Sequence, residues 1–193
     1  MPFILASASP QRIDLLTQIG RVPKQIVIPD IDETVLKGEK PKNLSCRLAY
    51  LKAKSVSDRY NNNFIVAADT VVCSGRRILE KTQCKNKAYN YLNILSGSKH
   101  RVYGGIAVIG PNVKRIRSVV THVSFKKISD QEIELYLKTN EWKNKAGAYA
   151  IQGQGSKFIK RINGSYSNVV GLCLYTIESI LGNLKELNYV ARK

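Results

Sequence analysis

The stretch FIVAADTVV at residues 64–72 constrains the fold of this chain more than any other, because it is apolar and rich in β-branched residues yet contains a carboxylate, Asp69. An apolar run of this length predicts a central strand that is covered on both faces. An ionised Asp inside such a strand costs free energy unless it is paired, bound to a metal or placed at an exposed strand end. Two interpretations follow: a structural carboxylate that caps backbone at the end of the strand, or a metal ligand or general base in a cleft at the end of the sheet.

The rest of the chain alternates strand and helix patterns. Residues 2–6 predict a short buried strand followed at once by a helix, with Ser9 as its N-cap, Pro10 in its first turn and Gly20 at its end. A capping box at Ser129 and Glu132 begins a later helix, and Gly182 is expected to end the last one. Further helices are expected around residues 44–54, 88–95, 129–137 and 175–181, and further strands at residues 25–29, 78–81, 101–109 and 119–125.

Size and composition limit the class of protein. The 193 residues suit one large domain or two small lobes that share a sheet. The 31 Lys and Arg residues against 14 Asp and Glu give a net charge of +17, which favours an anionic partner: nucleic acid, a membrane surface or a phosphorylated small molecule.

The four cysteines form no C-x-x-C pair, so a zinc site or a disulfide framework is not expected. No segment has the apolar length of a membrane span, and we expect a protein of the reducing cytoplasm.

Three short segments could bind an anionic ligand or a cation. Ser7, Ser9 and Arg12 surround the start of the first helix, where free backbone N–H groups can bind phosphate, although a capped helix needs no ligand. The acidic run at residues 30–33 could be a solvated turn or could supply oxygen ligands to Mg²⁺. The glycines that flank Gln152 could be plain turns or could let backbone approach a ligand closely.

Seven ordered motifs resemble the Maf family of nucleoside triphosphate pyrophosphatases, over roughly residues 3–181. These are LASASPQR at 5–12, ADTVV at 68–72, LEK at 79–81, LSG at 95–97, KAGAY at 145–149, IQG at 151–153 and NGSY at 163–166. The resemblance implies a single domain over residues 1–193 with an α/β fold: a mixed twisted sheet with flanking helices, and two lobes around a central cleft, similar to inosine triphosphate pyrophosphatases. It also implies hydrolysis of a nucleoside triphosphate between its α and β phosphates, in nucleotide-pool house-cleaning.

The resemblance also implies roles for nine residues. Asp69 corresponds to the proton acceptor and Glu33 to its acidic partner, and the two would hold a divalent cation, Mg²⁺ or Mn²⁺. Lys52 and Lys81 correspond to lysines that face the phosphates. The substrate-binding residues implied are Ser7, Ser9, Arg12, Thr70 and Gln152. Family members that resemble this chain at Arg12, Thr70 and Gln152 prefer dTTP and UTP, and a Gln amide can pair with the carbonyl and N–H edge shared by thymine and uracil.

The chain departs from the family pattern at four positions. Gln11 replaces the first of two arginines, so a phosphate contact made there would be weaker and uncharged. Thr82 and Cys84 replace a Pro and an Asp, and Cys173 replaces a Pro, where we expect effects on loop stiffness and helix capping only.

Other functions remain open at this stage. A nucleic-acid-binding module would explain the net charge but needs no buried Asp69, and no tyrosine pair is arranged beside a clear basic run. Partner binding in septum formation or division arrest is the other alternative. The enzyme hypothesis is favoured, with a nucleoside triphosphate as partner, nucleic acid and membrane disfavoured, and a homodimer left open.

Overall fold

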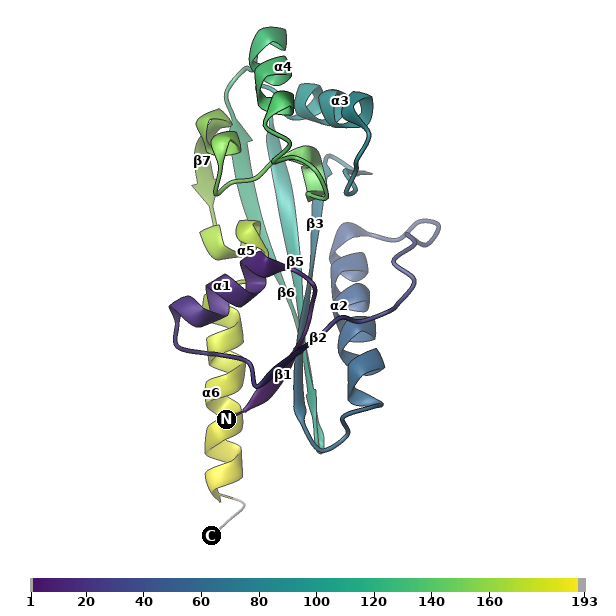
Figure 1. Ribbon diagram of the computed structural model, residues 1–193, viewed down its shortest axis with the longest axis vertical. Helices are drawn as coiled ribbons and strands as arrows, with labels where there is room; N and C mark the ends of the chain where they lie inside the picture. The colour runs from purple at the N-terminus through teal and green to yellow at the C-terminus, as the bar shows by residue number, and fades with distance from the viewer. Residues whose placement is uncertain (1, 191–193) are drawn as a thin grey trace.

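The protein, described by a computed structural model over residues 2–190 with side chains to residue 184, is an elongated α/β structure built on one mixed sheet (Figure 1). The strands are β1 (Phe3–Ala6), β2 (Gln25–Val27), β3 (Phe64–Ser74), β4 (Arg77–Ile78), β5 (Lys99–Gly110), β6 (Val113–Phe125) and β7 (Ile159–Asn163). The α-helices are α1 (Pro10–Gln18), α2 (Pro41–Ser57), α3 (Lys85–Leu95), α4 (Asp130–Lys138), α5 (Tyr166–Val170) and α6 (Leu174–Val190). Two 3₁₀ turns, η1 (Ala146–Ala148) and η2 (Gln154–Phe158), follow α4.

The sheet has seven strands in the order β2-β1-β3-β5-β6-β7, with β4 paired to β3. β1 is parallel to both β2 and β3, and the other pairs are antiparallel. The predicted mixed α/β sheet is therefore confirmed. The expectation that residues 64–72 form a covered central strand is also confirmed, since β3 lies between β1 and β5 and is buried along most of its length.

Alternation along β3 sends successive side chains to opposite faces of the sheet. Ile65 and Ala67 pack under α2, whereas Val66 and Ala68 pack with residues of α1 and α6. Figure 1 shows α2 on one side of the long strands and α1 with α6 on the other. Asp69 continues the α2 side of this alternation, and Thr70 continues the α1 side.

A separate core lies at the other end of the long strands, beneath α3 and α4 (Figure 1). It contains the continuations of β3, β5 and β6, at Val72, Val102 and Val123, together with Tyr136 of α4 and Phe158. The two ends of the sheet thus carry separate hydrophobic cores, and β3 passes from one to the other.

Several boundaries differ from the sequence prediction. α6 continues through Gly182 to Val190, because the packing of Ile177, Leu181 and Leu184 against the core outweighs the roughly 1 kcal/mol that a glycine costs inside a helix. β6 begins at Val113 because it pairs with β5 throughout. Of the predicted strand at 78–81, only Ile78 is in a strand, β4 (Arg77–Ile78). The capping box at Ser129 is confirmed.

Within the described part of the chain, every helix is too short or too polar to cross a membrane.

Candidate active site

A cleft of about 850 Å³ lies beside the middle of the sheet, with Thr70 and Val72 of β3 in its wall. Eight of the nine residues implied by the family resemblance line it: Ser7, Ser9, Arg12, Glu33, Lys52, Thr70, Lys81 and Gln152. The ninth, Asp69, is 3% exposed and lies behind Lys52, to which it is bound. The structure therefore brings all nine residues to one place.

Helix α2 approaches β5 unusually closely beside Asp69. Gly105 is the β5 partner of Asp69, and a β-carbon at Gly105 would lie 2.7 Å from the backbone nitrogen of Cys46. Ser45 and Ala49 of α2 are small and fully buried on this side of the sheet, Ser45 against Gly105 and Ala49 in one cluster with Ala107 of β5. Because the helix is so close to the sheet, the side chain of Lys52, one turn further along, reaches Asp69 while remaining buried.

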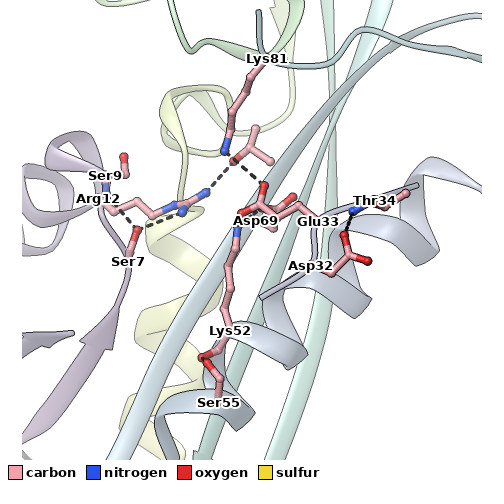
Figure 2. A network of polar contacts seen from close by, with 11 residues as sticks. Ser7, Ser9, Arg12, Asp32, Glu33, Thr34, Lys52, Ser55, Asp69 and Lys81 are labelled. Carbon is pink, nitrogen blue, oxygen red and sulfur yellow. Dashed lines mark hydrogen bonds and ion pairs between the residues drawn. The ribbon is translucent and has the colours of Figure 1, made fainter. Parts of the chain in front are cut away.

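Lys52 forms an ion pair with both predicted catalytic carboxylates. Its Nζ lies 2.6 Å from Asp69 Oδ1 and 2.7 Å from Glu33 Oε1 (Figure 2). The side chains of Lys52 and Asp69 are 6% and 5% exposed, respectively. The interpretation of Asp69 as a cap at the end of a strand is thereby corrected, because Asp69 is in the middle of β3 and its carboxylate binds Lys52.

Glu33 reaches this site from the loop that joins β2 to α2, and the loop is tied to α2 by Arg47. The guanidinium of Arg47 binds both carboxylate oxygens of Glu39 and donates to the carbonyl of Thr34 at 2.9 Å. Asp32 accepts the N–H of Thr34 at 2.8 Å, so this carboxylate shapes the turn. Of the acidic residues at 30–33, Glu33 is the one whose ion pairs link it to Lys52 and Lys81.

The charges around Glu33 favour its ionised form. Burial raises the pKa of Glu33, but the hydrogen bond and charge of Lys52 lower it, and Lys81 at 3.6 Å lowers it further, so that the net pKa lies below its ordinary value of 4.5. Glu33 is therefore ionised at neutral pH. The site is a cationic pair, Lys52 and Lys81, held around two carboxylates (Figure 2).

The lowered pKa of Glu33 predicts a pH dependence of stability. A carboxylate with a depressed folded-state pKa stabilises the protein above its unfolded pKa and loses that contribution as the pH falls through the folded value. The difference in free energy of unfolding between wild type and Glu33→Gln should therefore be constant from neutral pH to about pH 5 and shrink below pH 4.5. Urea titrations at a series of pH values measure it. A difference that grows as the pH falls would contradict the lowered pKa.

Arg12 connects the predicted phosphate-binding segments on the other face of β3. Its side chain donates to Ser7 Oγ at 3.0 Å, to the carbonyl of Gly171 at 3.0 Å and to Thr70 Oγ1 at 3.3 Å. Burial lowers the pKa of Arg12 while Asp69 and Glu33 raise it, and the guanidinium stays charged at neutral pH. Since a guanidinium has five N–H donors and these bonds use three, donors remain for a ligand in the cleft.

The start of α1 differs in detail from the predicted cap. Ser9 occupies the N-cap position and Pro10 the first turn, but the Ser9 hydroxyl donates to Gln11 Oε1 at 3.1 Å and makes no side-chain cap bond. Instead, the backbone N–H of Ser9 donates to Ser7 Oγ at 3.2 Å. Gln11, which replaces a family arginine, thus positions the Ser9 hydroxyl at the edge of the cleft.

The cleft also contains residues that the sequence did not identify as site residues. Lys145, at the start of the KAGAY motif, lines the cleft, and burial lowers its pKa, as does the charge of Lys81 to a smaller extent. Glu141 lines the same wall and belongs to no motif found in the sequence. The KAGAY motif could have indicated Lys145, whereas no periodicity or spacing indicated Glu141.

Tyr149 lines the cleft with a largely buried ring. Its hydroxyl lies 2.8 Å from Nε2 of the buried His100, and the rings of His100 and Phe125 pack edge-on against it. Burial lowers the pKa of His100 to about 4, so the imidazole is neutral at neutral pH and adds no charge to the cleft.

The donor set suits a divalent cation that shares its coordination with a ligand. Asp69 and Glu33 are two carboxylates brought within reach of one ammonium, and no group of three or more His, Cys, Asp or Glu that could hold a metal ion occurs among the described residues. Mg²⁺ is commonly bound by one or two carboxylates, with waters and substrate phosphates completing its octahedron. Asp69 and Glu33 match this number of carboxylates.

Comparisons with known proteins identify the relatives of this chain. Residues 2–184 match the family Maf, described as Maf-like protein. The chain is 50% identical over 179 residues to a nucleoside triphosphate pyrophosphatase of Ehrlichia ruminantium (strain Welgevonden), covering 92% of this chain and 93% of that one. It is 49% identical to a dTTP/UTP pyrophosphatase of Chelativorans sp. (strain BNC1), covering 92% and 88%, and 48% identical to one of Rhodospirillum rubrum, covering 93% and 86%.

Proposed function

This chain belongs to the Maf family, and we propose on that basis that it hydrolyses nucleoside triphosphates to the monophosphate and pyrophosphate. The observation that carries the proposal is the buried Lys52 bound to both Asp69 and Glu33 at the edge of a cleft that also holds Lys81 and Arg12. Phosphoanhydride hydrolysis needs carboxylates to orient water and cations to neutralise the charge of the leaving pyrophosphate. This cleft supplies both.

Each residue has a distinct role in this proposal. Asp69 accepts the proton of the attacking water, and Glu33 orients that water. The water oxygen bonds to the α-phosphorus as the bond from that phosphorus to the oxygen bridging the α and β phosphates breaks. Lys52 and Lys81 neutralise the negative charge that passes to the leaving pyrophosphate. Ser7, Ser9 and Arg12 bind phosphate oxygens at the start of α1. Because bound phosphates compete with the carboxylates for the ammonium of Lys52, substrate binding weakens the hold of Lys52 on Asp69.

Asp69 and Glu33 would hold the divalent cation, Mg²⁺ or Mn²⁺. Such an ion, when bound, lowers the pKa of a water ligand and neutralises phosphate charge. The protein residues keep their own tasks: Asp69 takes the proton, and the lysines bind phosphate.

Base selectivity is the finer part of the proposal, with dTTP and UTP as preferred substrates. Gln152 is exposed at the wall of the cleft, where its amide can offer both a donor and an acceptor to thymine or uracil. Cytosine carries an amine and a bare N3 at the corresponding edge, so polar groups that the bound base covers would remain unpaired at a cost of about 1–3 kcal/mol each. The relatives from Chelativorans and Rhodospirillum rubrum carry the name dTTP/UTP pyrophosphatase.

Purified protein with Mg²⁺ or Mn²⁺ is expected to release pyrophosphate, not orthophosphate, from dTTP and UTP. CTP, ATP and GTP should have kcat/KM values lower by at least about tenfold. Ion chromatography identifies the products, and methylene analogues locate the cleavage. The β,γ-methylene analogue of dTTP should be hydrolysed and the α,β-methylene analogue should not.

Two results would contradict parts of this proposal separately. A nucleoside diphosphate product, or no turnover of any common nucleotide, would overturn the pyrophosphatase assignment. Equal kcat/KM values for dTTP and CTP would overturn the base preference and leave the pyrophosphatase assignment intact.

A further inference from the structure

The loop at residues 150–154, which carries Gln152, is anchored by two side chains from the region of α4. The backbone N–H of Ala150 donates to Tyr136 Oη at 3.0 Å, and the backbone N–H of Gln154 donates to Glu141 Oε2 at 2.7 Å. Tyr136 is fully buried in the core beneath α4, so its bond belongs to the packing of the fold. Glu141 is at the wall of the cleft, beside Gln152.

Gly153 shows how closely the carboxylate of Glu141 approaches this loop. The φ angle of Gly153 is −116°, which other residues adopt readily, so its dihedral does not require glycine. A β-carbon at this position would, however, lie 2.7 Å from Glu141 Cδ and 2.9 Å from Oε1. A side chain at residue 153 would therefore require the carboxylate of Glu141 to move from this position.

We propose that Glu141 is a positioning residue that determines base selectivity, because its carboxylate fixes residues 152–154 and so orients the Gln152 amide in the cleft. The proposal deepens the proposed function and rests on it. A hydrogen bond to a charged acceptor is roughly twice as strong as a neutral one, and this bond is two residues from Gln152. Without this hydrogen bond, the loop is not fixed before the base binds, so ordering the loop uses part of the binding free energy. Gln152 then no longer distinguishes one base from another.

Glu141→Ala is expected to raise KM for dTTP by about tenfold and to lower the dTTP/CTP ratio of kcat/KM by about tenfold, with the change falling on KM more than on kcat. Glu141→Gln keeps an acceptor oxygen of the same reach and should retain most of the selectivity. Glu134→Ala is the matched control, since it removes another acidic side chain from the α4 region, paired with Lys85 and outside the cleft. It should leave both values unchanged.

A double-mutant cycle tests the contact between Glu141 and Gly153. Gly153→Ala alone forces the carboxylate away and should reduce the ratio as Glu141→Ala does. In the Glu141→Ala/Gly153→Ala variant the added methyl group has space, so the double variant should lose no more selectivity than the worse single variant. Additive losses would overturn the proposed contact.

Amide hydrogen exchange tests the anchor without reference to activity. The Gln154 amide should exchange faster in Glu141→Ala than in wild type, and at nearly the wild-type rate in Glu141→Gln. An active wild type whose Glu141→Ala variant keeps its dTTP/CTP ratio would overturn the positioning role alone, whatever its melting temperature. An inactive wild type would overturn the proposed function and the selectivity role with it. An unchanged exchange rate of the Gln154 amide in Glu141→Ala would overturn the anchor.

Discussion

Asp69→Asn is expected to lower kcat/KM for dTTP by a factor of about 10² or more, because asparagine keeps the size of the side chain but cannot accept a proton. The fold should survive this change. Lys52 still has Glu33 as a partner at 2.7 Å, so no charge at this position is left without its counter-ion. Steady-state kinetics and thermal unfolding of the same preparation measure the two effects.

Asp58→Asn is the matched control for this prediction. Asp58 is an exposed carboxylate that also pairs with a lysine of α2, Lys54, but lies outside the cleft. Its replacement should change kcat/KM by less than about twofold. Near-normal turnover in Asp69→Asn would show that another carboxylate accepts the proton.

Lys52→Met is expected to cost about 3–5 kcal/mol of unfolding free energy as well as most of the activity, since removing one partner of a buried ion pair leaves the other charge uncompensated. The charge left behind is that of Asp69, whose side chain is 5% exposed. Urea denaturation measures the loss of stability. Lys54→Met, which breaks an exposed pair on the same helix, should cost at most about 1 kcal/mol.

The double variant Lys52→Met/Asp69→Asn separates the stability effect from the catalytic one. Removing the buried charge should recover much of the stability lost in Lys52→Met, because a neutral Asn needs no ammonium partner. Activity should not recover, since the proton acceptor and a phosphate-binding cation are both gone. Equal free energies of unfolding for Lys52→Met and the double variant would contradict the view that the charge of Lys52 compensates the charge of Asp69.

Local patterns in the chain were sufficient for most of the secondary structure. The covered strand β3 follows from its run of apolar residues, and the capping box at Ser129 follows from residues with special backbone preferences. Both signals act over a few positions of the chain. Where local preference and packing disagreed, packing prevailed: α6 passes through Gly182 because its neighbours in the helix contact the core.

The ordered motifs contain seven of the nine predicted site residues, and the family resemblance implied the other two, Glu33 and Lys52. The sequence alone left several of the nine with a structural alternative. Asp69 could have been a strand-end cap, Ser9 the cap of a helix without a ligand, and Glu33 part of a solvated turn. Short motifs identify which residues matter, but they carry no information on which side chains meet across the fold. The roles of these residues remain predictions for the experiments above.

Tertiary structure alone decided how the site is assembled. Lys52 reaches Asp69 because Gly105 lets α2 approach the sheet. Asp69 and Thr70 lie on opposite faces of the sheet because side chains alternate along β3. Glu141 was found only from its contact with Gly153 and Gln154, twelve or more residues further along the chain. Interactions of this kind depend on distances between segments that are remote in sequence, and no local propensity records those distances.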